Sequence, residues 1–466
     1  MSSNLSWAET RRKAAHMAAF WPALFLPWMS PLQALGVTFL LLLMNVFILP
    51  RAAPGLYRAE ATGMGALEIV LYPAALMACV IAFGYAPSGS PYPLAAEGGK
   101  PGWYLPVGAA WFALAFVDAC IGFACRLFPG GPALPWNPRK PMLAVALGTL
   151  AALLPAWALA RVALPALALQ PVPDPAASGY LILGALVLAA ACAETAWFGV
   201  ADNLVIPFFL CVLIPLIPSP LSATGGFPSP AWYWGLVPIG FGALAYLGRM
   251  LTLGGSVLGA VMALLLILAD PRLFAFLGGF FALGNLATRY GFARKQALRI
   301  AEARGGKRGA AEVFGAMGLA AWMTPLAHLA RGTPQVTHAL LVCAAPLIAK
   351  TMDTVSSEMG KAIGGRTFSL RTFRSVAPGS EGGVSLAGTL SGLAAAALMA
   401  FAILPLGWGG LADAFLLLAI ALLANVFESY WGEWAAPRGM DQGPHTNVLM
   451  TLAAAVLAWL YWFGLH

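Results

Sequence analysis

The chain has 466 residues, of which 60% are hydrophobic and 9% are charged, with a formal net charge of +8. Its mean hydropathy is +0.80. Apolar stretches recur from near residue 17 to residue 463, and each approaches the roughly 20 residues that a helix needs to cross a bilayer. This pattern excludes a soluble globular protein and predicts an all-α, polytopic membrane protein.

The basic residues fall mainly in short loops between the apolar stretches, where Lys and Arg mark the cytoplasmic side of a membrane protein. We therefore expect membrane lipid around the chain and no nucleic-acid partner. The charged residues 1–16 are followed by no small-residue cleavage site, so we expect this segment to be retained. The six cysteines lie in apolar stretches without a CxxC pair, which indicates packing roles rather than a metal site. The oligomeric state stays open.

The apolar stretches predict about 13 to 15 transmembrane or re-entrant helices in two unlike halves. Pro and Gly residues at 218–230 indicate a linker between a first domain, 1–217, and a second, 231–466. No motif recurs at matching positions in the halves, which disfavours an inverted-repeat transporter. The candidate helices are 17–30, 33–50, 65–84, 103–125, 142–168, 178–198, 203–217, 231–248, 253–269, 271–288, 310–330, 336–352, 384–405, 409–427 and 446–463.

The first predicted helix opens with a basic segment. Arg12 and His16 are four residues apart, so on a helix they share one face. A basic face with a histidine can hold a phosphate or assist proton transfer. The alternative is a membrane anchor of the positive-inside type with a histidine at the interface.

A carboxylate lies inside an otherwise uncharged apolar stretch of the first half. Asp118 should face a polar interior, since a charge inside the membrane is costly. The segment that follows carries Asn137, Arg139 and Lys140. We expect Asp118 to hold a metal ion and to act in catalysis, while the three residues after it bind phosphate oxygens.

Several first-half motifs occur together in a known order. RRKAAH, Glu68 in ALEIVLYP, Asp118, LPWNPRK, and Glu194 with DNLVIP span about residues 10–217. This half resembles the phytol kinases and the related dolichol kinases, which are CTP-dependent membrane kinases of isoprenoid alcohols. The family usually has Gly on both sides of the Asp, and Ser and Gly after Asn-Pro-Arg-Lys. Here those four positions are Val117, Ala119, Pro141 and Ala144.

The second half holds a basic segment at residues 289–308, with seven basic residues against one acidic residue. It reads as an amphipathic helix followed by a glycine-rich turn. Backbone amides of such a turn can cradle an anion, and we expect Lys307 and Arg308 to bind phosphate. The alternative is a cytoplasmic helix lying on anionic lipid.

Residues 350–390 concentrate carboxylates, basic residues and glycines between two apolar stretches. We expect Asp353 and Glu358 to hold Mg²⁺ and to act in catalysis, although their spacing puts them about 140° apart on a straight helix. Joint binding would therefore need a bend or a second ion. A glycine-rich entry into the next helix is a seat for anions. The predicted phosphate-binding residues of this segment are Arg371, Arg374, Ser380, Gly382, Gly383 and Ser385.

The last predicted loop carries further polar residues. Glu428 ends one apolar stretch, and Asn447 begins the next. We expect Glu428 to contribute to the metal site and Asn447 to the phosphate site. A solvated hairpin is the alternative.

Four spaced motifs of the second half also agree in order with a known family. LGNLATR…RKQAL…AEARGGKRGAAEV, DTVSSEMG, SVAPGSEGGVSLAGTL, and ESYWGE with TNVLMTL cover about residues 249–463. They resemble the phytyl-phosphate kinase family of integral membrane proteins, whose members are thought to add a second phosphate to an isoprenyl monophosphate. Glu312 stands where that family usually has Asn.

Together the halves predict a fusion of consecutive steps, from an isoprenoid alcohol to its monophosphate and then to the diphosphate. The expected donor is CTP or another nucleoside triphosphate, with Mg²⁺. The alternatives are a phosphatidate cytidylyltransferase-like enzyme and a non-catalytic lipid-phosphate binder or transporter. We expect all active-site loops on the cytoplasmic side.

Overall fold

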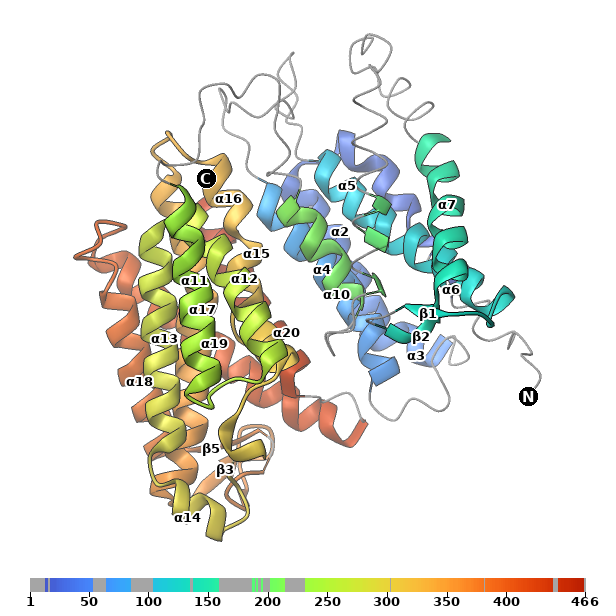
Figure 1. Ribbon diagram of the computed structural model, residues 1–466. Helices are drawn as coiled ribbons and strands as arrows, with labels where there is room; N and C mark the ends of the chain where they lie inside the picture. Colours follow the sequence, from blue (N-terminus) through green and yellow to red (C-terminus); the bar gives the residue numbers. More distant parts are fainter. Residues whose placement is uncertain are drawn as a thin grey trace. The chain divides into compact units, whose positions relative to one another are not determined.

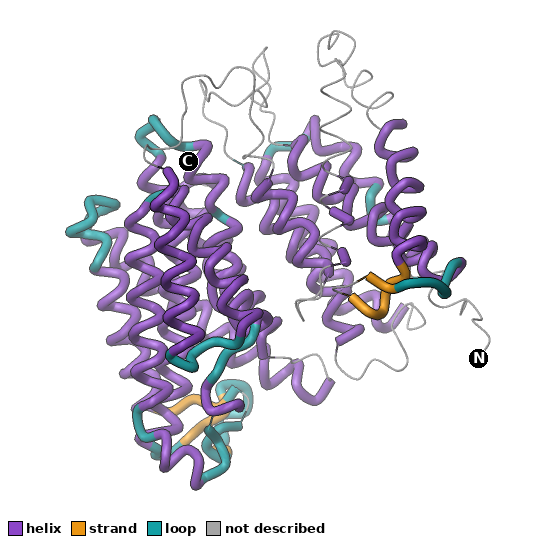
Figure 2. The backbone as a smooth tube through the Cα atoms, in the orientation of Figure 1, coloured by secondary structure: helices purple, strands orange, loops and turns teal. Residues whose placement is uncertain are grey.

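The computed structural model describes most of the chain, and its helices confirm the all-α fold class (Figures 1 and 2). The chain divides into two compact units, Met1–Ser222 and Ala223–His466. The predicted helix at 178–198 falls almost wholly outside the described residues. The structure describes residues 13–15, 17–52, 64–84, 104–134, 137–158, 187–188, 190–191, 194–195, 202–213, 231–301, 303–380, 382–438 and 443–464.

Within these residues, six helices are long and apolar enough to cross a membrane. They are Pro31–Ala52, Val107–Leu127, Ala310–Leu329, Val336–Ile363, Leu411–Ala435 and Gly443–Gly464. Shorter apolar helices of 10–17 residues accompany them in both units. The chain is an integral membrane protein, as its composition predicts.

In the first unit, a hairpin interrupts the helices where a loop was expected. β1 and β2 pair antiparallel, with Leu134 opposite Asn137, so Asn137, Arg139 and Lys140 all belong to β2. A π-helical turn, η4, directly precedes Asp118, and such turns are frequent at functional sites. The described elements of this unit are η1 (Trp21–Trp28), α2 (Pro31–Leu43), η2 (Met44–Ile48), α3 (Leu49–Ala52), α4 (Met64–Phe83), α5 (Tyr104–Phe112), η4 (Ala113–Val117), α6 (Asp118–Leu127), β1 (Ala133–Leu134), β2 (Asn137–Pro141), α7 (Met142–Ala158) and α10 (Asp202–Leu213).

The second unit is a helical bundle with a small three-stranded sheet in the order β4-β3-β5. Its elements are α11 (Ala231–Leu247), α12 (Leu253–Ala269), α13 (Pro271–Arg289), α14 (Phe292–Ala297), η7 (Ala303–Gly306), α15 (Ala310–Trp322), α16 (Thr324–Leu329), α17 (Val336–Ile363), β3 (Thr367–Ser369), β4 (Ser375–Val376), β5 (Gly383–Ser385), α18 (Leu386–Phe401), α19 (Leu411–Ala435), η8 (Ala436–Arg438), α20 (Gly443–Trp459) and η9 (Leu460–Gly464).

Successive long helices of the second unit run in opposite directions, so its connections collect at two ends (Figure 1). One end, which we call the loop end, holds residues 248–252, 290–309 and 364–385 with α14, β3 and β5, as far as these residues are described. The opposite end holds Asp270 and residues 330–335 and 402–410. Among the described residues, the loop end carries most of the basic side chains, whereas the opposite end carries Arg272 and Arg331.

Helix α17 is the centre of the second unit. It contacts α13, α15, α18, α19 and α20, and every side chain from Ala339 to Met352 is buried. A helix that is apolar on all sides is stable only when other helices surround it. Its 28 residues span about 42 Å at 1.5 Å per residue, longer than the roughly 30 Å hydrocarbon core. The helix therefore brings its C-terminal part to the level of the lipid headgroups when its other end lies at the opposite membrane surface.

Small residues bring α17 and α18 into close contact. Ser356 and Gly360 on α17 face Gly388 and Gly392 on α18, and both pairs have the four-residue spacing that allows close helix approach in membranes. A Cβ atom at Gly388 would lie 2.5 Å from the carbonyl oxygen of Ser356. Because helix association in lipid depends on such close packing, these glycines fix the distance between the two helices.

Replacing Gly388 with Ala should therefore destabilise the second unit by about 1–3 kcal/mol, since the added methyl group overpacks a backbone contact. A matched control is Gly278→Ala, where a Cβ atom meets nothing within 4 Å. Thermal unfolding of the purified protein in detergent measures both. Equal midpoints for the two variants would contradict this packing role.

Candidate functional site

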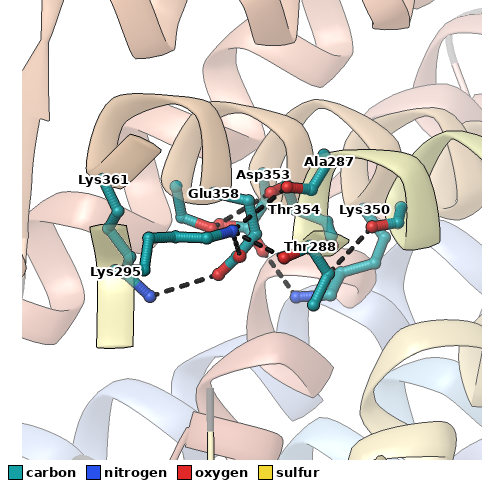
Figure 3. Close-up of polar contacts among 10 residues, drawn as sticks. Ala287, Thr288, Lys295, Lys350, Asp353, Thr354, Glu358 and Lys361 are labelled. Carbon is teal, nitrogen blue, oxygen red and sulfur yellow. Dashed lines mark hydrogen bonds and ion pairs between the residues drawn. The ribbon is translucent and has the colours of Figure 1, made fainter. Parts of the chain in front are cut away.

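A face of α17 near the loop end carries four charged side chains in an apolar helix. Lys350, Asp353, Glu358 and Lys361 occupy an arc of about 140° around the helix. The helix is continuous from Val336 to Ile363, so it contains no break between the two carboxylates. Figure 3 shows that each carboxylate lies beside its own lysine.

Glu358 forms a fully buried ion pair with Lys295 of α14. Lys295 Nζ lies 2.5 Å from Glu358 Oε2, and the two side chains are 0% and 1% exposed. The same ammonium donates hydrogen bonds to the carbonyl oxygens of Thr288 (2.7 Å) and Ala287 (3.2 Å). Lys361 Nζ lies 3.4 Å from Glu358 Oε1. The three donors of Lys295 are thus satisfied, as a buried ammonium requires.

Asp353 belongs to a second network, which joins α17 to α20. Lys350 Nζ lies 2.5 Å from Asp353 Oδ2 and 2.7 Å from Asn447 Oδ1. The structure therefore brings together two residues that the sequence assigned to one site, through a lysine that the sequence analysis did not single out. The side chain of Asp353 is 13% exposed, so it is more accessible than that of Glu358.

The fit of Mg²⁺ differs between the predicted ligands. Mg²⁺ is usually held by one or two carboxylates together with substrate phosphates. Asp353 fits as one such carboxylate, whereas Glu358 is enclosed by two lysines and does not. Glu428 lies on α19, with its Oε2 3.5 Å from Ser429 Oγ. Among the described residues, no three His, Cys, Asp or Glu side chains form a metal-binding group.

The glycine-rich entry to α18 is organised by packing. Gly382 has a φ of +69°, and a Cβ atom there would lie 2.4 Å from the Ser429 carbonyl oxygen. The Gly383 N–H donates to the Ser380 carbonyl oxygen at 3.0 Å, so this amide is already used and does not form the expected anion cradle. Ser385 Oγ accepts from the Gly388 N–H at 3.2 Å and caps α18.

The remaining basic residues of the loop end differ in exposure. Lys307, Arg371 and Arg374 are exposed, whereas Arg308 is half-buried. The expected continuous helix at 289–308 is wrong, because α13 ends at Arg289 and the chain then forms the short elements α14 and η7. This break turns Lys295 into the core of the unit.

In the first unit, each predicted acidic residue also has a lysine partner. Lys13 Nζ lies 2.6 Å from Asp118 Oδ2, with both side chains below 10% exposure. Lys140 Nζ lies 2.6 Å from Glu194 Oε1. Arg12, His16 and the side chains of Asn137 and Arg139 lie outside the described part of the chain. Lys13 was not singled out from the sequence, although it directly follows Arg12.

Replacing Lys295 with Met should destabilise the second unit by about 3–5 kcal/mol, because Glu358 would remain buried without its main partner. The double variant Lys295→Met/Glu358→Leu should recover a large part of that loss. Lys307→Met, at an exposed lysine, serves as the control. Unfolding curves in detergent that show Lys295→Met equal to the control would contradict the structural role of the pair.

Comparison with known proteins gives matches to membrane proteins. Residues 236–456, within the second unit, match the model of a family described as "Integral membrane protein DUF92". "Uncharacterized membrane protein sll0875" of Synechocystis sp. is 40% identical over 130 residues, which are 28% of this chain and 49% of that protein. "Protein VTE6, chloroplastic" of Arabidopsis thaliana is 33% identical over 160 residues, which are 34% and 48% of the two chains.

A third relative, "Uncharacterized membrane protein MJ0933" of Methanocaldococcus jannaschii, is 26% identical over 208 residues, which are 44% of this chain and 81% of that protein. The match spans about half the length of the first two relatives. No solved structure gives a significant match to the chain. The similarity thus assigns most of the second unit to a group of integral membrane proteins.

Proposed function

We propose that the second unit is a membrane kinase that phosphorylates an isoprenyl monophosphate to the diphosphate, with CTP or another nucleoside triphosphate as donor. The observation that carries this proposal is the lysine-rich network of α17. Lys295, Lys350 and Lys361 face Asp353 and Glu358, so three positive charges minus two negative charges leave one positive charge. A positive excess in a weakly hydrated site favours an anionic ligand.

The network suits phosphoryl transfer, in which the protein mainly positions groups and stabilises negative charge. Lys350 already donates to two oxygen atoms, Asp353 Oδ2 and Asn447 Oδ1. A phosphate oxygen is an acceptor of the same kind, so it can take the place of the Asn447 oxygen without leaving the ammonium unpaired. When Mg²⁺ is bound, with Asp353 as its carboxylate ligand, it would neutralise charge on the donor phosphates.

The motif resemblance supports the same assignment. The segments that resemble phytyl-phosphate kinases contain Lys295, Asp353, Glu358 and Asn447, which are the residues of the two networks. The similarity to the membrane protein family covers the same part of the chain. For the first unit we propose phosphorylation of an isoprenoid alcohol, supported by the buried Lys13–Asp118 and Lys140–Glu194 pairs.

We place the loop end on the cytoplasmic side, because basic residues concentrate at the cytoplasmic ends of membrane helices. With that orientation, the C-terminal part of α17 meets a water-soluble nucleotide from the cytoplasm. The apolar tail of the lipid substrate would stay in the membrane.

Asp353→Asn should reduce diphosphate formation from geranylgeranyl monophosphate by about 100-fold or more, because it removes the carboxylate that pairs with Lys350 and would hold the metal ion. Asp270→Asn at the opposite end is the control, since Asn also caps a helix well. The assay uses purified protein, CTP and Mg²⁺, with chromatographic separation of mono- and diphosphate. Wild-type rates in Asp353→Asn would sink the proposed role.

The proposed orientation predicts where single cysteines react. In a chain whose six native cysteines are replaced, Lys307→Cys and Ser380→Cys should be labelled by a membrane-impermeant maleimide only from the cytoplasmic side. Arg331→Cys should be labelled only from the other side. Labelling of Lys307→Cys and Ser380→Cys from opposite sides would contradict a single active face.

A further inference from the structure

An apolar pocket lies between α11, α12, α13 and α15 of the second unit. Its walls include Phe241, Leu277, Phe280, Phe281 and Met317. The rings of Phe241 and Phe281 pack against each other with centroids 4.9 Å apart. We call this pocket the groove, and its walls suit a hydrocarbon chain rather than a polar ligand.

Polar groups occur at the loop end of the groove. Arg308, Ser256 and Asn285 are among its lining residues. Leu277 precedes Asn285 by eight residues of α13, so it lies about 12 Å farther from the loop end. The groove is thus polar near the loop end and apolar toward the middle of the membrane, which matches a molecule with one charged head and one apolar tail.

The backbone holds Arg308 firmly at this position. Its N–H donates to the Met250 carbonyl oxygen, and its carbonyl oxygen accepts from the Thr252 N–H, both at 3.0 Å. A Cβ atom at Gly255 would lie 2.7 Å from the Arg308 carbonyl oxygen, so only glycine permits this approach. A half-buried guanidinium with five N–H donors is well suited to phosphate oxygens.

Ser256 gives an independent sign of a missing polar ligand. Its side chain is 6% exposed, and its Oγ has no hydrogen-bond partner within the described part of the chain. Leaving a buried hydroxyl unpaired is costly. Ser256 follows Gly255, which contacts the Arg308 backbone, so the hydroxyl and the guanidinium belong to the same end of the groove.

The groove adjoins the Lys295–Glu358 network through α13. A Cβ atom at Gly284, a lining residue, would lie 3.5 Å from Thr354 of α17. One turn later, the Thr288 carbonyl oxygen accepts from Lys295. A head group held at Arg308 would therefore lie next to the charged face of α17.

From these observations we infer that the groove binds a single-chain isoprenyl monophosphate, with its phosphate at Arg308 and Ser256 and the adjoining part of its tail along the phenylalanine-lined wall. This inference rests on the proposed function and names the substrate site for it. Free phosphate would make no use of the apolar walls, and a phospholipid would bring a second chain.

The test uses a farnesyl monophosphate that carries a diazirine in its tail, added to the full-length protein in nanodiscs. After irradiation, mass spectrometry should locate the label on peptides of α11, α12, α13 and α15. Excess geranylgeranyl monophosphate should abolish the labelling, whereas inorganic phosphate and dioleoyl phosphatidate should leave most of it. Label confined to lipid-facing residues such as Phe415 of α19 would overturn the inference, as would full competition by phosphatidate.

Variants examine each end of the groove. Arg308→Gln should lower the labelling roughly tenfold or more, and Ser256→Ala should lower it by about 3- to 10-fold. Gly259→Leu, which fills the groove, should abolish it. The controls are Arg249→Gln, at an exposed arginine of the loop end, and Gly240→Leu, at an exposed glycine of α11 with open space around it. Both should be labelled like the wild type; equal labelling of Gly259→Leu and Gly240→Leu would refute the groove.

Two further outcomes separate this inference from the proposed kinase activity. Specific labelling of the groove without diphosphate formation would keep the groove and refute the kinase. Diphosphate formation with an unchanged KM for geranylgeranyl monophosphate in Gly259→Leu would keep the kinase and refute the groove. Circular dichroism and thermal unfolding of each variant establish that a loss of labelling is not a loss of fold.

Discussion

The second unit depends on one buried ion pair, Lys295 with Glu358. Removing two charges from water is so costly that the pair persists only when further hydrogen bonds complete it, as the carbonyl oxygens of Ala287 and Thr288 do here. The pair therefore fixes three elements at once: the end of α13, the short helix α14, and α17. A mismatch at any of them would leave a charge buried alone.

From this fixed point the loop end follows. Arg294, beside Lys295, donates to the Ile363 carbonyl oxygen at 3.1 Å and so satisfies the C-terminus of α17. The glycine-rich turn after α14 packs against Thr288, and the next residues pair with the start of α12. The same short stretch thus joins the charged face of α17 to the groove that begins at Arg308.

The helices and the polar segments could be predicted from the sequence, because apolar length and charge are local properties. The pairing of charges could not, since Lys13–Asp118, Lys295–Glu358 and Lys350–Asn447 join residues 105, 63 and 97 positions apart. A general signal was available: a lysine in an apolar helix needs a partner. The glycines of residues 379–383 look like an anion cradle in sequence, yet Gly382 serves close packing against α19, which only tertiary structure reveals.

The most direct test of the account is the identity of the lipid product. Wild-type protein is incubated with Mg²⁺, γ-³²P-labelled CTP and, in separate reactions, geranylgeraniol, geranylgeranyl monophosphate or phosphatidate. The account predicts that the monophosphate becomes a diphosphate that carries the label. A CDP-lipid formed from phosphatidate, or no covalent product despite saturable binding of the monophosphate, would contradict it.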